Sequence, residues 1–542
     1  MKNRNFRNYL AYSASASVGL AMVLFGQNTH SALLDITQTT QKQPVLVGAM
    51  IAKSLAEQIG TGHGDINTPG SSLYLIKRDP ARAVRRGRQL FQRKFTHNQG
   101  LGPRVNNDSV GDLTTNTALG AGLAESCSSC HSRPRGSAGF GGDGNTRPDS
   151  RDAPHLFGLG LVEMIADEIT SDLRAIRSQA ISQAKNTATT VKLELVSKGI
   201  KFGFIQASAT GVVDTSMVDG IDADLRVRPL AAHGKDFSIR AFVNVAYKDI
   251  MGIEPVDPLV CQATDPANPQ RVVTPAGLIL DPSLDKITRP PACSTNEDPD
   301  GDGVKNELDY ALVDYMEFYL LNYFKPAIGQ VTPNVLAGLD SMNKVGCTSC
   351  HIQNIQINND RRIADVETNF DPEKGIFNRL FATATPRVKV ENDGQSIPLI
   401  LPENKSFLVQ NIFADFKRHN LGPNFHERQY DGSIATKFVT EPLWGVGTTR
   451  TYGHDGRSIN LKEVILRHGG EAKEQRDKFA ALTDEQQNQV IEALSALVLF
   501  PPDDTASNLN PGKPKTANPQ DPAEHGSISL SPLFQITSEG KE

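Results

Sequence analysis

The chain has 542 residues with a formal net charge of −5, and 22% of its residues are charged. This composition is ordinary for a folded, water-exposed protein and excludes both an intrinsically disordered chain and a protein built from many membrane spans. Basic residues form no continuous stripe, so nucleic acid is not an expected partner.

Residues 1–32 have the pattern of an export signal. Lys2, Arg4 and Arg7 precede an apolar stretch from Tyr9 to Gly26. The stretch is long for a cleaved signal and lacks a clear cleavage motif, so an uncleaved membrane anchor is the alternative. Either case predicts a periplasmic protein, free or anchored by this segment.

A helix is predicted to begin at Asp79-Pro80, where an N-cap residue precedes a proline in the first turn. Gly87 lies on its apolar face and predicts a second helix that crosses closely. Gly338 and Met342 repeat this pattern further along the chain. The other apolar residues at helical spacing are Val84, Leu90, Phe91 and Phe95.

Two pentapeptides, Cys127–His131 and Cys347–His351, have the pattern Cys-x-x-Cys-His. Two thiols at this spacing form thioethers with the two vinyl groups of one porphyrin, and the adjacent imidazole coordinates the iron. Redox dithiols do not need the histidine, and a zinc site needs further ligands. We therefore predict two covalently bound haem c groups, with these attaching cysteines and proximal ligands: Cys127, Cys130 and His131, then Cys347, Cys350 and His351.

The remaining cysteines, Cys261 and Cys293, are expected to form a disulfide, because export places the chain in an oxidising compartment. Two unrelated free thiols are the alternative. Nearby, the composition predicts a polar helix that ends over residues 178–186, strands over 190–195, 200–206 and 211–217, and a helix over 237–247.

Residues 298–309 match a calcium-binding loop, with oxygen ligands at alternating positions and glycine at the sharp turn. The expected ligands are the carboxylates of Asp298, Asp300, Asp302 and Asp309, the carbonyl of Val304, and Asn306 directly or through water. Aspartate stands where such loops usually end in glutamate, so an acidic turn without metal is the alternative.

A capping box at Thr483 and Gln486 begins a closing helix with apolar residues up to Val498. We therefore predict a mainly α fold of two cytochrome c-like haem domains, with a small β insertion and long loops. The expected divisions are an export segment (1–32), a first haem domain (75–190), a β insertion (191–297), a calcium loop with the second haem domain (298–500), and an extended tail (501–542).

No methionine follows Met342, so the second haem lacks the usual downstream methionine as its sixth ligand. We favour His454, with Tyr452 second, because both lie in the segment Tyr452–Arg457. The alternatives are solvent or one of three other histidines, His419, His426 and His468.

Several of these segments resemble the di-haem oxidoreductase family, which is related to bacterial di-haem cytochrome c peroxidases. The similar segments are Gly100–Pro103, Pro442–Gly445, His454–Arg457 and His468–Ala472. The resemblance implies two α-helical domains, in which the N-terminal haem meets peroxide and the C-terminal haem receives electrons. Gly453 departs from the pattern, because classical peroxidases have methionine there.

The resemblance also suggests two further site residues. Glu163 lies in a segment similar to the distal stretch of relatives and is nominated for proton transfer, with His155 as a weaker candidate for a displaceable ligand. Trp444 is the sole tryptophan and a candidate bridge between the porphyrins. The alternatives are an ordinary glutamate at a helix start and a packed indole.

The resulting hypothesis is an exported oxidoreductase that reduces hydrogen peroxide, or another small oxidant, with electrons from a small cytochrome or cupredoxin. An electron-transfer cytochrome without catalysis is the second hypothesis. Oxidative modification of a partner protein is the third, because Tyr452 could ligate an iron as tyrosine does in some relatives.

Overall fold

The computed structural model describes residues 55–95, 124, 126–131, 137–139, 153–290, 292–299, 305–370, 380–429 and 432–499. The expected export segment and the tail lie outside these ranges. Among the residues described, no helix combines the length and the apolar character that a membrane span requires.

The prediction of a mainly α fold is wrong. Over the described residues the protein is 37% helical and 17% strand, and its strands form one three-stranded and seven two-stranded sheets. Five of the two-stranded sheets are built by residues 355–439, which follow the second Cys-x-x-Cys-His motif. Most of these strands have only two to four residues and so carry no long periodic signal, and the sequence analysis predicted no strand there.

The helices are α2 Leu55–Ile59, α3 Ser72–Arg78, α4 Pro80–Gln92, α5 Leu159–Thr187, α6 Ile239–Val245, α7 Pro258–Ala263, α8 Tyr310–Leu321, α9 Pro333–Val345, α10 Leu461–Arg467, α11 Lys473–Ala480 and α12 Asp484–Ser495. Shorter turns are η3 Cys127–Ser129, η4 Ala246–Met251, η5 Cys347–Ser349, η6 Pro423–Phe425 and η7 Gly470–Ala472. Of these, η4 is a π-helix and the others are 3-10 helices.

The strands are β1 Val191–Ser197, β2 Ile200–Ala207, β3 Val213–Asp214, β4 Val272–Val273, β5 Ile279–Leu280, β6 Ala327–Ile328, β7 Ile355–Ile357, β8 Ala364–Phe370, β9 Leu380–Pro386, β10 Val388–Glu391, β11 Leu399–Pro402, β12 Phe407–Val409, β13 Arg418–His419, β14 Glu427–Arg428, β15 Ile434–Ala435, β16 Phe438–Val439 and β17 Leu497–Val498. Every pair of strands in these sheets is antiparallel.

Helix α4 confirms the first predicted helix, with Asp79 as its N-cap. It crosses α8 at Gly87, where an added Cβ would lie 2.2 Å from the carbonyl oxygen of Tyr315. Only glycine permits this approach, which confirms the predicted close crossing. Helix α8 belongs to the segment assigned to the second haem domain, yet it packs on the helix that precedes the first motif. The domain boundaries themselves stay a prediction.

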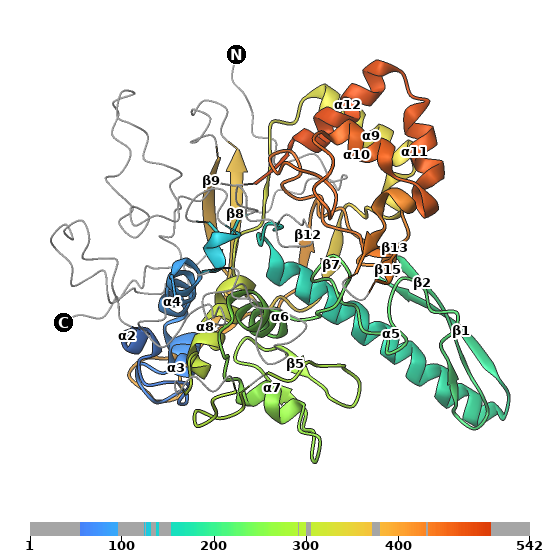
Figure 1. The fold of residues 1–542 in the computed structure, drawn as a ribbon. Helices are drawn as coiled ribbons and strands as arrows, with labels where there is room; N and C mark the ends of the chain where they lie inside the picture. Colours follow the sequence, from blue (N-terminus) through green and yellow to red (C-terminus); the bar gives the residue numbers. More distant parts are fainter. Residues whose placement is uncertain are drawn as a thin grey trace, which may run out of the picture.

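A second crossing joins α9 and α12, which lie together with α10 and α11 in one lobe (Figure 1). At Gly338 an added Cβ would lie 2.0 Å from the carbonyl oxygen of Gln489. The predicted capping box of Thr483 and Gln486 is confirmed at the start of α12. The helix ends at Ser495, however, and the next residues form β17 against β6 instead of continuing it.

The insertion forms an arm in which the β1–β2 hairpin packs along the distal part of α5 (Figure 1). The first two predicted strands are confirmed, the third is reduced to the two residues of β3, and α6 confirms the predicted helix after them. Apolar residues on facing sides of α5, β1 and β2 form one core cluster.

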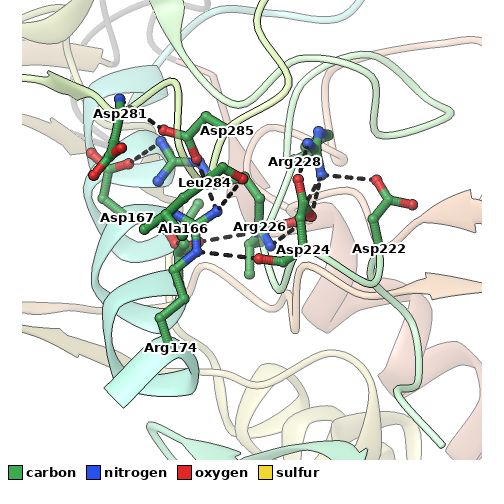
Figure 2. A network of polar contacts seen from close by, with 12 residues as sticks. Ala166, Asp167, Arg174, Asp222, Asp224, Arg226, Arg228, Asp281, Leu284 and Asp285 are labelled. Atoms are coloured by element: carbon green, nitrogen blue, oxygen red, sulfur yellow. Dashed lines mark hydrogen bonds and ion pairs between the residues drawn. The ribbon is translucent and has the colours of Figure 1, made fainter. Parts of the chain in front are cut away.

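Ion pairs fasten two loops to α5 (Figure 2). Arg226 donates to Asp167 of α5 at 2.8 Å, and Arg174 of α5 donates to Asp285 at 3.0 Å. Further along the chain, Cys261 and Cys293 form the predicted disulfide, with their Cα atoms 5.6 Å apart. Closing this loop of 32 residues stabilises the folded chain by roughly 3.7 kcal/mol in the chain-entropy account.

Candidate functional site

Both Cys-x-x-Cys-His motifs fold into the same 3-10 turn, η3 in the first and η5 in the second. The backbone N–H of His131 donates to the carbonyl of Cys127 at 3.1 Å, and that of His351 donates to Cys347 at 3.0 Å. None of the four motif cysteines forms a disulfide, whereas Cys261 and Cys293 are bonded to each other. The two motifs therefore present two thiols and one imidazole in the same local geometry.

The two motif imidazoles are oriented by backbone carbonyls. Nδ1 of His131 donates to the carbonyl oxygen of Pro154 at 2.7 Å, and Nδ1 of His351 donates to that of Phe413 at 2.9 Å. Burial lowers the pKa of both rings, so each is neutral near pH 7, with its proton on the nitrogen that donates to the carbonyl. This second-shell bond is typical of histidines that ligate metals, including haem iron.

The first thiol of each motif is also desolvated. Burial raises the pKa of Cys127 to about 12 and that of Cys347 to about 11. Redox-active dithiols work as thiolates with a lowered pKa, so these thiols do not suit thiol–disulfide exchange. They suit covalent attachment of a porphyrin, which removes the ionisable proton.

Apolar and aromatic side chains surround each motif. The first motif adjoins the cluster that contains Phe91, Phe95 and Tyr247, and the ring of Phe91 lies 6.4 Å from that of His131. The second motif adjoins the cluster that contains Met342, Phe413 and Tyr452. Such walls exclude water and lower the local dielectric, as a haem pocket requires. The residues present at both motifs therefore fit a haem.

The favoured sixth ligand of the second haem, His454, contacts an aromatic ring and a carboxylate. Its ring stacks on Phe438 with centroids 3.8 Å apart, and its Nε2 lies 3.5 Å from Oε2 of Glu427. The same carboxylate oxygen lies 3.5 Å from Nε2 of His233. Tyr452, the second choice, is buried in the cluster that also contacts Cys347. The assignment of either residue as a ligand stays a prediction.

His468 has the geometry of a metal-ligating imidazole. Its Nδ1 donates to the carbonyl oxygen of Val464 at 2.7 Å, as the motif histidines do to their own carbonyls. Burial, together with the nearby ring of His351, lowers the pKa of His468 to about 4. A neutral imidazole close to His351 therefore presents Nε2, which the sequence prediction ranked below His454.

His419 is held by two carboxylates and is unsuited to bind iron. Its Nε2 donates to Asp415 at 2.9 Å and its Nδ1 donates to Glu471 at 2.8 Å. Burial opposes its charge, but the bond to Asp415 outweighs this and raises the pKa of His419 to about 11. One atom each from His419, Asp415 and Cys350 lie within 4.8 Å of one another, so a fixed positive charge stands beside the second motif.

Trp444 lies between the loops that orient the two motif histidines. Its carbonyl oxygen accepts a hydrogen bond from Nε2 of His155 at 2.7 Å, and its indole Nε1 donates to the carbonyl of Gln410 at 3.3 Å. His155 follows Pro154 directly, and Gln410 precedes Phe413 by three residues. The position agrees with a bridge between the two sites, although electron transfer through it stays a prediction.

Glu163 is buried and makes two hydrogen bonds among the described residues. One oxygen accepts from the backbone N–H of Ile239 at 2.6 Å, and the other accepts from Arg361 at 2.7 Å. Burial raises the pKa of Glu163 to about 8, although Arg361 opposes the rise. These contacts join α5 to the start of α6, so Glu163 stabilises the fold. Its predicted role in proton transfer is a separate matter.

His155 has both ring nitrogens engaged, because its Nδ1 also accepts from the backbone N–H of Phe157 at 3.2 Å. Of the expected calcium ligands, Asp300, Asp302 and Val304 lie outside the described residues. Asp309 caps α8 through the backbone N–H of Ala311 at 2.8 Å. The side-chain oxygen of Asn306 is buried and has no hydrogen-bond partner among the described residues, which suits a metal ligand.

A family model matches the C-terminal part of the chain. The family model described as "Di-haem oxidoreductase, putative peroxidase" matches residues 374–497. The predicted resemblance to di-haem oxidoreductases is confirmed. No curated protein matches the chain.

The part matched to the di-haem oxidoreductases begins after the second motif and contains Phe413, which orients His351, and also Trp444, Tyr452 and His468. The family implies haem cofactors and an oxidoreductase, so the chemistry inferred from the two motifs and from this match agrees. Sequence reasoning missed Pro154 and Phe413, because they act through backbone carbonyls, which no side-chain pattern marks.

Proposed function

We propose that the protein is an exported c-type di-haem oxidoreductase with peroxidase-like activity. One haem would be held by Cys127, Cys130 and His131, and the other by Cys347, Cys350 and His351. The observation that carries this proposal is the shared geometry of the motifs, in which each histidine commits Nδ1 to a backbone carbonyl. The family match supports the same class of chemistry.

A bound haem c supplies one-electron chemistry and an iron that can activate the O–O bond of a peroxide. The proposed reaction at the first site is the reduction of hydrogen peroxide, with two electrons and two protons, to two molecules of water. The electrons would come from a small cytochrome or cupredoxin that docks near the second site.

The chain's own residues would support this reaction by orientation, exclusion of water and proton transfer. The carbonyls of Pro154 and Phe413 hold the motif imidazoles in one tautomer and make Nε2 more basic. Apolar clusters exclude water from both sites. Glu163 is the proposed proton donor, because its raised pKa allows the carboxyl group to hold a proton near neutral pH.

Two further parts of the proposal concern location and calcium. The Cys261–Cys293 disulfide is expected in an oxidising compartment and supports export, in keeping with the signal pattern at the N-terminus. The buried oxygen of Asn306 supports calcium binding by the loop 298–309. A periplasmic protein, either free or anchored, with one structural calcium ion follows from these proposals.

An electron-transfer cytochrome without catalysis is the second candidate, and it requires both irons to be closed. A second imidazole close to His351 would close the sixth position of that iron, as in electron carriers. Oxidative modification of a partner protein is the third, and the burial of Tyr452 beside the second motif supports it.

The deciding experiment uses the full chain matured in a host that attaches haem c. Electron paramagnetic resonance and a carbon monoxide titration would count open irons, and oxidation of a reduced small cytochrome would be followed with and without peroxide. Peroxidase function predicts one iron that binds carbon monoxide and peroxide-dependent turnover. Two closed irons and no turnover would favour the electron carrier.

A further inference from the structure

Tyr247 is a buried tyrosine beside the first motif that no sequence pattern marked as functional. It lies in η4, the π-helical turn that follows α6, and it is 1% exposed. Its ring meets Phe95 edge-on, with centroids 6.0 Å apart and planes at 88°. Single π-helical turns of this kind occur often at functional sites.

The hydroxyl group of Tyr247 has no hydrogen-bond partner among the described residues, although it is fully buried. Two other buried tyrosines of the same cluster differ in this respect. The hydroxyl of Tyr315 accepts from Arg86 at 2.6 Å, and that of Tyr323 accepts from the backbone N–H of Ala138 at 2.9 Å. A buried phenol without a partner costs free energy, so a hydroxyl kept in such a place suits a partner that the described residues do not supply.

The surroundings of Tyr247 indicate that the partner of its hydroxyl group is bound at the first haem. Burial raises the pKa of Tyr247 well above its ordinary value, and the Cys127 thiol lies close enough to raise it further. The phenol is therefore a neutral donor beside the thiol that would attach the porphyrin. The backbone of η4 also reaches this motif, because the N–H of Ala124 donates to the carbonyl of Ile250 at 3.3 Å.

We infer that the Tyr247 hydroxyl points into the pocket of the first haem and donates a hydrogen bond to a ligand bound at its iron. This inference rests on the proposed attachment of haem at Cys127. A thioether at Cys127 marks the vinyl edge of the porphyrin, and the propionates occupy the opposite edge. The proposed acceptor is therefore a ligand at the iron rather than a propionate.

The Tyr247 hydroxyl would then select among the ligands that bind the iron. A neutral phenol favours ligands that accept a hydrogen bond, such as peroxide, fluoride and carbon monoxide through its oxygen. Tyr247 would thus be a specificity residue of the first site, distinct from Glu163, which is held by Ile239 and Arg361.

The test compares Tyr247→Phe with Tyr315→Phe in the full-length protein that carries both haems. Tyr315 is the matched control, because it belongs to the same cluster and its hydroxyl already has a protein partner. Two readouts are used. These are the C–O stretching frequency of the reduced carbon monoxide complex and the dissociation constant of fluoride for the oxidised protein.

Loss of the donated bond should raise the C–O stretching frequency and weaken fluoride binding about 10-fold in Tyr247→Phe, and neither should change in Tyr315→Phe. If the wild type binds both ligands and Tyr247→Phe changes neither readout, the inference is overturned while the proposed function stands. If the wild type binds neither ligand, the inference and the peroxidase proposal fail together. Changes of equal size in both variants would indicate altered packing and would also overturn it.

Discussion

The crossing of α9 and α12 at Gly338 offers the sharpest test of how the fold supports the second site. A methyl group at this position would lie 2.0 Å from the carbonyl oxygen of Gln489 and 2.8 Å from Cβ of Ala493. Since unbonded carbon and oxygen atoms keep more than 3 Å apart, the helices must separate by about 1 Å. Backbone atoms cannot rotate out of the way, so the cost falls near the upper end of overpacking, about 3 kcal/mol.

Alanine has a better helix propensity than glycine by about 1 kcal/mol, which leaves a net loss of about 2 kcal/mol for Gly338→Ala. We expect the melting temperature of the holoprotein to fall by about 2 °C, because the entropy of unfolding grows with chain length and this chain has 542 residues. Cys347 follows α9 by two residues, so the second haem should also show an altered or heterogeneous absorption spectrum.

Leu336→Ala is the control, because this side chain lies on the same helix and is 51% exposed. It should change stability by no more than about 0.5 kcal/mol. Gly87→Ala, at the α4–α8 crossing, should affect the first haem in the same way. Unchanged stability and spectra in Gly338→Ala, measured by thermal unfolding and absorption, would refute this account of the crossing.

Four other predictions follow from the sites. His468→Ala should open the sixth position of the second haem, seen as a new high-spin signal, whereas His454→Ala should not; the reverse result would restore His454 as the ligand. Glu163→Gln should lower peroxide turnover about 100-fold while carbon monoxide still binds, and full turnover would leave Glu163 a structural role only. Because folding raises the pKa of Glu163 from 4.5 to about 8, the protonated carboxyl group contributes stability that is complete below pH 4.5. This contribution is lost as the pH rises towards 8. Urea unfolding should therefore show a fall in stability over this range that Glu163→Gln removes, and an equal fall in the variant would contradict the assignment. Cys261→Ser should lower the unfolding free energy by roughly 3 to 4 kcal/mol, and a loss below about 1 kcal/mol would show that the disulfide contributes little.

The sequence predicts local features whose signals are short and chemically specific. Asp79 and Thr483 begin helices as expected, because side-chain caps act within one turn. Gly87 and Gly338 mark the two helix crossings, because glycine on an apolar helix face has few other uses. The two Cys-x-x-Cys-His motifs, which share a sequence pattern, also share the same 3-10 turn.

Other features depend on contacts between distant segments and could not be predicted. Most of the strands around the hairpin β8–β9 have two to four residues, and their pairing is decided by tertiary packing, so the fold class was predicted wrongly. Sequence pattern could not separate His468 from His454, because the difference lies in the bond from Nδ1 to Val464 and in the closeness of His351. Tyr247 was missed because a buried hydroxyl without a hydrogen-bond partner among the described residues is visible only in three dimensions.

The central claim is that one chain carries two porphyrins through thioether bonds at its two motifs. Mass spectrometry of the matured protein, after denaturation and acid-acetone extraction, tests this claim most directly. We predict a mass increase of two haems that survives extraction, reduced to one haem when both cysteines of either motif are replaced by serine. Release of the pigment on extraction, or fewer than two haems per chain from a competent host, would contradict the account.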